Sequence, residues 1–389
     1  MTSPKSRLPL QLTIITFGRL LFNTGVRVVY PFAPAFARGL GVPLADVYSL
    51  IALRNFAGFL SPLFSPLSAR YGRRATMAGA LLFFAIGCAV VFIWPAYWPF
   101  GLTLAVIALA KVIYDPAMQA YVGDNVPYAK RGRAISITEL SWAGALLLGA
   151  PAVGLLIRTM GWQAPFVWLA VLAGITAVFL WRVLPQTKSR TDSRGSDLRD
   201  VWRVVRHNRV IWAAMLFTAL IMASNELLFI VFGGWLEFNF GLSLLALGFS
   251  ASLIGGAEVL GEVFSGWSVD RFGKRPVVML TGSLNVAASL LLPFTDFNLP
   301  LALTAYFLLF LFFEITVVGS IPLLTEIVPS ARTVVMSSVL AASALGRALG
   351  AWLGPALFSE VGFVGNGIAA AVLMTLAVLV LAYGIREGE

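Results

Sequence analysis

The chain has 389 residues, of which 59% are hydrophobic and only 12% are charged, whereas a soluble domain carries about 25% charged residues. A composition this apolar excludes a water-soluble globular protein, so most of the chain is expected to face lipid or the interior of a helical bundle. The formal net charge of +10 would suit a nucleic-acid partner, but the positions of the basic residues indicate another cause.

Twelve apolar segments of helical length follow one another, each with about the 20 residues that cross a bilayer. They begin near Leu10, Leu44, Arg74, Trp98, Gly132, Trp162, Val210, Leu244, Arg275, Leu299, Thr333 and Phe363. The only long polar stretch, residues 185–209, separates the sixth segment from the seventh and carries apolar residues at helical spacing among arginines. We therefore expect an all-α membrane protein of twelve transmembrane helices in two pseudo-symmetric six-helix bundles, residues 1–184 and 210–389. The linker between them is expected to be cytoplasmic and to hold an amphipathic surface helix.

Lysine and arginine are distributed unevenly between the two sides that these segments define. Of the 28 such residues, 21 fall at the termini, in the linker and in the loops of one side, and five lie inside segments. The opposite side has only two, Arg38 and Arg158. This asymmetry predicts that both termini are cytoplasmic and that the protein crosses the plasma (inner) membrane many times. It also accounts for the positive net charge without a nucleic-acid partner.

A loop motif occurs twice, at residues 65–74 and 266–275, with its copies 201 residues apart. The second copy has Gly266, Asp270, Arg271, Gly273, Lys274 and Arg275, and the first matches it at Arg70, Gly72, Arg73 and Arg74. Each copy follows one apolar segment and precedes another. A repeat of this length in an apolar chain predicts two homologous membrane halves.

The second copy of the motif resembles the signature loop of the major facilitator superfamily of secondary transporters, and the resemblance extends over almost the whole chain. Ala150-Pro151-x-x-Gly154 partly matches the motif of the family's antiporters, and the first segment with Tyr30-Pro31 is similar to the drug and metabolite efflux branch, whose members exchange protons. The resemblance implies alternating access by two rocking halves, with the first, fourth, seventh and tenth helices around a central cavity.

In that family the signature loop forms a charge latch on the cytoplasmic side. The resemblance implies that Arg73 pairs with Asp124, at the end of the fourth helix, and that Lys274 pairs with Glu326, at the end of the tenth. The first copy has Ala69 in place of the aspartate. It therefore lacks the carboxylate that would meet the positive end of a helix dipole.

Ionisable side chains inside apolar segments are costly and usually face a partner or a watery cavity. Arg19, Asn23 and Arg27 share one face of the first segment, and Lys111 and Asp115 are one turn apart in the fourth. With the helix arrangement of the family, the predicted substrate and cavity residues are Arg19, Asn23, Arg27, Lys111, Asp115, Asn225, Glu226 and Glu314.

A second set of charges falls on helices that the family places between its two halves. These residues are Arg54, Glu139, Glu258, Glu262 and Arg347. Two carboxylates one turn apart, as at Glu258 and Glu262, suit a site that takes up a proton. The predicted proton carriers are Asp115, Glu226, Glu258, Glu262 and Glu314, with Lys111 and Arg347 as moving partners of Asp115 and Glu314.

The eleventh segment carries a stripe of small residues. Gly346, Gly350 and Gly354 recur every four positions and so share one helix face. This spacing predicts a close backbone approach to another helix, with sliding at that contact during transport as a second interpretation.

The chain has no nucleophile elbow, no phosphate-binding loop and no close set of metal ligands. We therefore expect no enzyme activity, no cofactor and no metal ion. The leading prediction is proton-coupled efflux of an amphipathic small molecule by a monomer, with the substrate, protons and the lipid bilayer as partners. The alternatives are proton-coupled uptake or exchange of an anionic metabolite, which the basic N-terminal half favours, and a lipid-handling flippase or a membrane scaffold.

Overall fold

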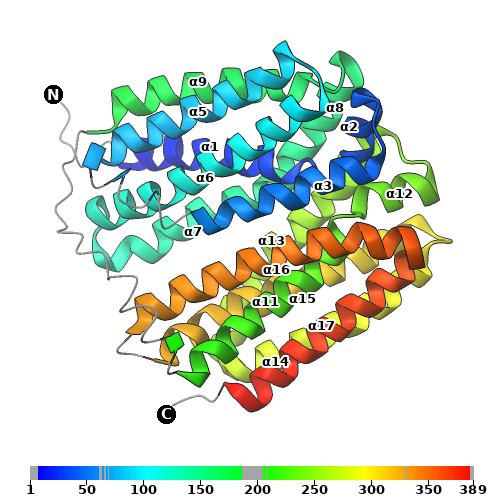
Figure 1. The fold of residues 1–389 in the computed structure, drawn as a ribbon. Helices are drawn as coiled ribbons and strands as arrows, with labels where there is room; N and C mark the ends of the chain where they lie inside the picture. The colour runs from blue at the N-terminus through cyan, green and yellow to red at the C-terminus, as the bar shows by residue number, and fades with distance from the viewer. Residues whose placement is uncertain are drawn as a thin grey trace. The chain divides into compact units, whose positions relative to one another are not determined.

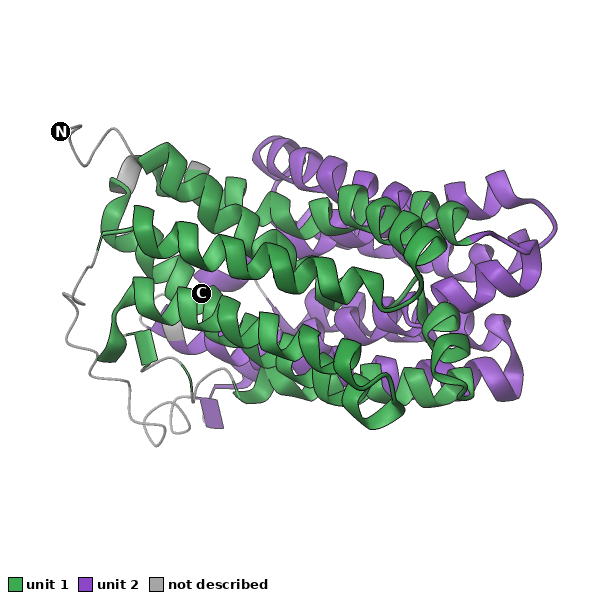
Figure 2. Cartoon of the chain, turned by 90° about the horizontal axis from the view of Figure 1, so that it is seen from above, with its two compact units in different colours: residues 1–193, 244–251 green, residues 194–243, 252–389 purple. Residues whose placement is uncertain are grey.

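The computed structural model describes residues 8–60, 64, 67–68, 70–185, 205–206, 208–328 and 331–385. Every secondary-structure element of these residues is a helix. Contacts divide the chain into two compact units, Met1–Ser193 with Leu244–Ala251 and Arg194–Ser243 with Ser252–Glu389 (Figure 2). The predicted amphipathic helix of the linker falls almost entirely outside the described residues, and so does Ala69.

The first unit holds the N-terminal helices, drawn from blue to green in Figure 1. They are α1 (Leu8–Arg27), α2 (Ala33–Leu40), α3 (Leu44–Asn55), the 3-10 helix η2 (Phe56–Leu60), α5 (Arg73–Ile93), α6 (Tyr97–Asn125), α7 (Tyr128–Gly144), the π-helix η3 (Ala145–Gly149), α8 (Ala150–Met160) and α9 (Ala164–Val183). The predicted fifth segment is thus α7, η3 and α8 in succession. Its π-helical turn ends just before Pro151, which has no N–H to donate and would clash with the carbonyl of the preceding turn.

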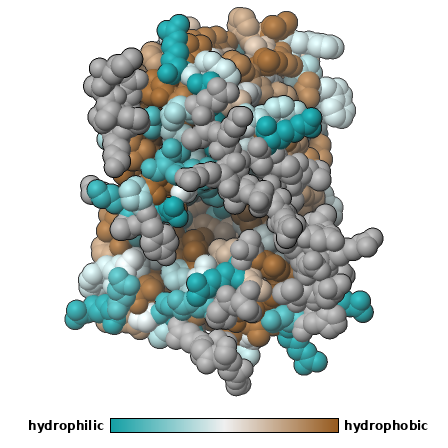
Figure 3. All heavy atoms as spheres, turned by 90° about the vertical axis from the view of Figure 1, so that its left-hand side faces the viewer, coloured by the Kyte–Doolittle hydropathy of each residue, from teal (hydrophilic) through white to brown (hydrophobic). Residues whose placement is uncertain are grey.

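The second unit holds the C-terminal helices. They are α11 (Arg209–Phe229), α12 (Phe232–Phe240), most of α13 (Leu244–Phe272), α14 (Lys274–Leu291), the 3-10 helix η4 (Leu292–Thr295), α15 (Leu299–Glu326), α16 (Arg332–Val361) and α17 (Phe363–Gly384). Within this unit α11 packs against α16 and α17. Hydrophilic side chains gather among apolar ones on the face drawn in Figure 3, the end at which α11 begins and α17 ends in Figure 1.

Ten helices of the described residues are long and apolar enough to cross a membrane, and α2 with the stretch Leu44–Leu60, bent by 116°, would make an eleventh. α1 has 20 residues but is not among them. Its polar residues, which include the predicted Arg19, Asn23 and Arg27, lower its hydropathy. The protein is therefore a multi-pass membrane protein, although length and composition alone do not reach the predicted twelve spans.

The internal repeat recurs in the backbone conformation. Within the described chain every residue with a positive φ is a glycine, and the six form three pairs: Gly41 (66°) and Gly241 (60°), Gly72 (86°) and Gly273 (89°), and Gly161 (92°) and Gly362 (77°). The members of each pair are 200 or 201 positions apart. Glycine takes this conformation without steric cost, so the two units make the same tight reversals at matching places.

The glycine stripe of α16 lies against α11. A Cβ added to Gly346 would lie 2.2 Å from Ala219 O, one on Gly350 would lie 2.6 Å from Ala223 O, and one on Gly354 would lie 2.5 Å from Ile230 Cγ2. A larger residue would overlap α11 at each of these points, so the stripe permits the close approach of two backbones. The close contact predicted from the spacing is confirmed, and its partner is α11.

Candidate functional site

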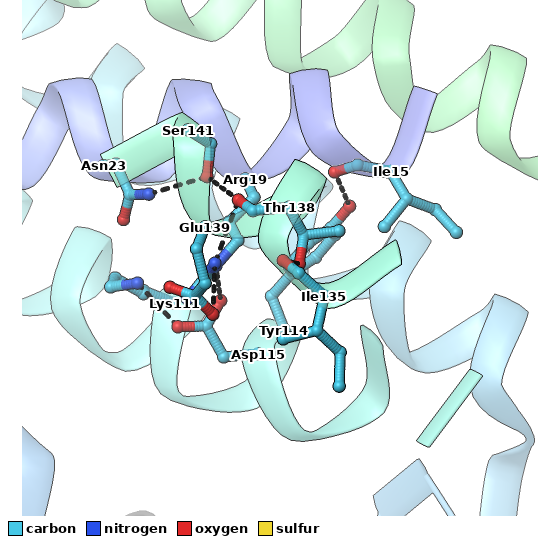
Figure 4. A network of polar contacts seen from close by, with 10 residues as sticks. All are labelled: Ile15, Arg19, Asn23, Lys111, Tyr114, Asp115, Ile135, Thr138, Glu139 and Ser141. Carbon is cyan, nitrogen blue, oxygen red and sulfur yellow. Dashed lines mark hydrogen bonds and ion pairs between the residues drawn. The ribbon is translucent and has the colours of Figure 1, made fainter. Parts of the chain in front are cut away.

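A network of four ionisable side chains lies within the first unit, where α1, α6 and α7 pack together (Figure 4). Arg19 Nη1 on α1 is 2.8 Å from Glu139 Oε1 on α7, and Arg19 Nε is 3.3 Å from Asp115 Oδ1 on α6. Lys111 Nζ is 2.6 Å from Asp115 Oδ2, one helical turn away. Two cations and two carboxylates are thereby joined in one chain with Arg19 and Asp115 at its centre.

Neutral polar groups complete the surroundings of Arg19. Its Nη1 also donates to Thr138 O at 3.0 Å, and Asn23 Nδ2 donates to Ser141 Oγ at 3.0 Å. The Ser141 hydroxyl donates to Thr138 O at 2.6 Å. Arg19 is 6% exposed and Asn23 is fully buried, so these bonds form in a low-dielectric region and strengthen one another.

The indole of Trp142 on α7 contacts two cations. The guanidinium carbon of Arg27 is 4.3 Å from the ring centroid and Lys111 Nζ is 5.8 Å from it, while Arg27 Nη1 donates to Trp142 O at 2.9 Å. A desolvated cation–π contact is worth about 2 kcal/mol, and Arg27 is 2% exposed. Trp142 was not expected from the sequence, although it follows Glu139 by three positions and so shares a face of α7 with it.

Arg54 lies at the end of α3, is 3% exposed and is held by neutral groups. Its Nη1 donates to Val26 O at 2.8 Å and its Nη2 donates to Tyr30 Oη at 3.2 Å. Arg54 and Glu139 were both predicted to lie between the halves, and that assignment stays a prediction. Within the first unit Glu139 pairs with Arg19, whereas Arg54 contacts residues at the end of α1.

In the second unit an ion pair joins α11 to α16. Arg347 Nη1 is 3.7 Å from Glu226 Oε2, and the Glu226 side chain is fully buried. A Cβ on Gly350 would lie 2.7 Å from Glu226 Cβ, so the glycine stripe brings the two charges together. This pair is not among those expected from the sequence.

The other candidate carboxylates of the second unit lie on α13 and α15. Glu258 is 1% exposed, Glu314 is 7% exposed and Glu262 is half-buried. A Cβ on Gly261 would lie 2.6 Å from Glu314 Cβ. Glu314 therefore packs on the stretch of α13 that carries Glu258 and Glu262, so three of the predicted proton carriers lie on adjoining helices.

The repeated asparagines share one feature. Asn23 is fully buried and Asn225 is 5% exposed, and the Oδ1 atom of each has no hydrogen-bond partner among the described residues, although Asn23 Nδ2 donates to Ser141. A buried amide oxygen without a partner costs free energy.

Both ion pairs implied for the repeated loop are present. Arg73 Nε is 3.3 Å from Asp124 Oδ2 in the first unit, and Lys274 Nζ pairs with Glu326 Oε2 in the second. The remaining charged residues of the motif, Arg70, Asp270 and Arg271, are exposed, and Gly72 and Gly273 precede α5 and α14.

The last arginine of each loop copy has a role that the sequence did not indicate. Arg74 Nη1 donates to Leu184 O at 3.2 Å, at the end of α9, and Arg275 Nη2 donates to Ala382 O, near the end of α17. Each arginine thus satisfies a carbonyl at the end of the last helix of its unit, where a cation is also favoured by the helix dipole.

No group of three or more histidine, cysteine, aspartate or glutamate residues that could hold a metal ion occurs in the described part of the chain.

A comparison with models of known protein families shows to which family this chain belongs. The model of the Major Facilitator Superfamily matches residues 15–257 and 215–389, which together cover almost the whole chain. The protein belongs to the Major Facilitator Superfamily. The curated relatives with a named activity in this family are transporters.

Several curated relatives in this superfamily are similar over part of the chain. A 2-nitroimidazole transporter of Escherichia coli is 27% identical over 244 residues, 57% of this chain and 56% of the relative. The uncharacterized MFS-type transporter YwfA of Bacillus subtilis is 27% identical over 164 residues, 42% of this chain and 40% of the relative. The multidrug transporter MdfA of Yersinia pestis is 31% identical over 148 residues, 37% of this chain and 35% of the relative. Each alignment thus spans little more than half of the relative's length or less.

Solved structures of transporters share the fold over nearly the whole chain. A D-xylose–proton symporter has a TM-score of 0.80 at 17% identity and covers 97% of each chain. A bacterial homologue of the human lysosomal transporter Spinster has a TM-score of 0.80 at 15% identity and covers 99% of this chain and 97% of its own. At such low identity the likeness concerns the fold.

Proposed function

We propose that this transporter exports amphipathic small molecules in exchange for protons, by alternating access. The observation that carries the proposal is the network in which one guanidinium, that of Arg19, joins Asp115 and Glu139 from two helices. Protonation of either carboxylate would weaken its ion pair and shift the balance between arrangements of α1, α6 and α7. Relatives named as 2-nitroimidazole and multidrug transporters support a drug-like cargo.

The proposal includes twelve spans in two halves, residues 1–184 and 210–389. α1 and the bent pair of α2 and α3 would add two spans to the ten that length and composition identify. The excess of arginine and lysine on one side supports cytoplasmic termini and a cytoplasmic linker at residues 185–209, in the plasma membrane. The pairs Arg73–Asp124 and Lys274–Glu326 would act as latches on that side.

The proton carriers we favour are Asp115 of the Arg19 network and, in the second unit, Glu258 and Glu314. Asp115 forms ion pairs with both Lys111 and Arg19, so protonation of its carboxylate would weaken two ion pairs at once. Glu258 and Glu314 are 1% and 7% exposed on adjoining helices. Carboxyl groups enclosed in this way take up or release a proton when the conformational cycle changes their surroundings.

The proposal is tested with purified protein in proteoliposomes that contain a pH-sensitive dye. An imposed pH gradient should drive uptake of 2-nitroimidazole or a lipophilic cation, with matching proton movement. Neutral variants of the five candidates, Asp115→Asn, Glu226→Gln, Glu258→Gln, Glu262→Gln and Glu314→Gln, separate gradient-driven transport from substrate exchange. A variant that has lost its proton carrier should lose gradient-driven transport and keep substrate exchange. The control Glu360→Gln, which changes an exposed residue, should keep both activities. If all five behave like the parent, coupling through these groups is wrong.

Uptake or exchange of an anionic metabolite is the second candidate. Arg54, buried among neutral partners, is the observation that favours it, because an organic anion would supply the countercharge. In the same proteoliposomes, Arg54→Gln should raise KM for organic anions and leave lipophilic cations unaffected. Transport of cations alone by the parent would exclude this candidate.

A further inference from the structure

An open apolar groove lies on the surface of the second unit, between the first turns of α11 and the last turns of α17. It has a volume of about 630 Å³ and is lined by residues that include Trp212, Leu216, Leu376, Leu379, Tyr383 and Gly384. Sites for small molecules commonly have volumes of about 300–1,000 Å³. The groove is thus large enough for a specific ligand, and it contains none of the charged residues assigned to transport.

Small residues open the groove. A Cβ on Gly384 would lie 3.1 Å from Ala213 Cβ, so the two helices are close where these residues meet, and larger side chains stand on either side. The matching junction of the first unit, between α1 and α9, is bridged instead, because Gln11 Nε2 donates to Val183 O at 3.4 Å and Gln11 is 6% exposed. The positions in the first unit that correspond to Trp212 and Gly384 are thus joined by a hydrogen bond.

The side chains along the groove change from aromatic near the helix ends to aliphatic further in, as polarity changes from the headgroups to the hydrocarbon of one membrane leaflet. Trp212 is 46% exposed and Tyr383 is 81% exposed, and both lie in the terminal turns, while the leucines lie deeper. Tryptophan and tyrosine favour the boundary between headgroups and hydrocarbon. The stretch from Leu376 to Gly384 spans about 12 Å along the helix, less than half of the roughly 30 Å hydrocarbon core.

Arginines lie close in the chain to the aromatic residues at the end of the groove. Arg209 precedes Trp212 by three positions, so the two share a face of α11, and both are exposed. Arg206 is also exposed, and Arg275 reaches Ala382 O beside Tyr383. Cations at this depth attract the phosphate of anionic lipids.

We propose that this groove binds one anionic phospholipid. Its acyl chain would lie along Leu216, Leu376 and Leu379, and its phosphate would lie beside Arg209. The proposal is independent of the cargo and of the direction of transport, because the groove contains no residue of the ion-pair networks.

Native mass spectrometry of the detergent-purified full chain tests it, with phosphatidylglycerol and phosphatidylcholine of identical acyl chains as the probes. Phosphatidylglycerol should occupy the parent at the higher level. Arg209→Gln should lower the phosphatidylglycerol occupancy about fivefold, the loss expected for one interfacial cation, and should leave the phosphatidylcholine occupancy unchanged. Arg209→Lys should restore the phosphatidylglycerol occupancy of the parent. Leu379→Trp, which fills the groove, should lower the occupancy of both lipids.

The matched control is Arg182→Gln, which removes an exposed arginine at the end of α9 in the other unit. It should bind phosphatidylglycerol like the parent. Equal binding of the two lipids by the parent, equal losses in Arg209→Gln and Arg182→Gln, or full occupancy in Leu379→Trp would each overturn the proposal.

Discussion

Arg19 holds two helices to α1 through separate atoms of one guanidinium group. Removing one partner of a buried ion pair costs about 3–5 kcal/mol, because the other charge stays behind without compensation. Solvent reduces this cost at Glu139, whose side chain is 39% exposed, more than at Asp115, whose side chain is 21% exposed. Asp115 also keeps Lys111 as a second partner, so the loss at each carboxylate is partial.

We expect Arg19→Met to lower the free energy of unfolding of the purified protein by about 1–3 kcal/mol, which is less than the cost of breaking an isolated buried ion pair. Glu139→Gln added to Arg19→Met should cost less than Glu139→Gln alone, with a coupling energy of about 0.5–3 kcal/mol. Thermal unfolding in detergent measures both effects. Arg158→Met, which removes an exposed arginine of α8, is the control, and equal melting temperatures for Arg19→Met and Arg158→Met would contradict a central role for Arg19.

Part of this site could be predicted from the spacing of residues alone. Lys111 and Asp115 are four positions apart on one helix, and that distance is fixed by helical geometry. The pairs Arg19–Glu139 and Arg347–Glu226 join separate helices. The spacing of residues along the sequence does not determine how two helices are positioned against each other, so these pairs could not be predicted from it. The loop pairs Arg73–Asp124 and Lys274–Glu326 could be anticipated only through the family resemblance.

At the scale of elements, the contact between α16 and α11 depends on the absence of side chains. Gly346 marks its tightest point, since an added Cβ would lie 2.2 Å from a backbone oxygen of α11. Backbone cannot move aside as the end of a flexible side chain can, so overpacking there displaces a whole helix. The same helix carries Arg347, and a displacement would therefore also move the partner of Glu226.

Gly346→Ala should destabilise the protein by about 1–3 kcal/mol or more and reduce transport even where the protein still folds. Gly256→Ala on α13 is the matched control, because a Cβ at Gly256 meets no atom within 4 Å. There alanine should be neutral or stabilising by up to about 1 kcal/mol through its higher helix propensity. Thermal unfolding of both variants compares them, and shifts of the same sign would show that the glycine stripe is not the cause.

The helices themselves follow from the apolar segments, whereas their irregularities do not. All twelve expected segments contain helix in the structure. The π-helical turn before Pro151 and the 116° bend between α2 and α3 were not foreseen. Local hydrogen bonding at a proline or a glycine can be satisfied in several ways, and neighbouring helices select among them.

At the scale of the whole molecule, the two halves share their reversals but differ in interior charge. The candidate residues of the first half are Arg19, Arg27, Arg54 and Lys111 against Asp115 and Glu139, whereas the second half has Arg347 against Glu226, Glu258, Glu262 and Glu314. One half thus has an excess of two positive charges and the other an excess of three negative charges. The repeat has kept a common backbone while its functional groups diverged.

Cysteine labelling tests the proposed orientation of the chain. Cys88 is the only cysteine and is buried, so Cys88→Ala gives a background without thiols. In that background Ser193→Cys, in the linker, should react with an impermeant maleimide only after the membrane is opened. Phe297→Cys, between η4 and α15 and 76% exposed, should react in intact cells. The reverse pattern would place the linker outside and reject cytoplasmic termini.

The paired left-handed glycines also predict how the gene tolerates change. At Gly41, Gly72 and Gly161, and at their partners Gly241, Gly273 and Gly362, any side chain meets the same backbone restriction. The acidic and basic positions of the two halves share no such restriction. In a library that carries every substitution at every position, selection for folded protein should therefore remove variants at both members of each glycine pair, which lie 200 or 201 codons apart. Selection of the same library for drug resistance should also remove variants at charged positions that have no counterpart in the other half, so the match between the halves should be weaker.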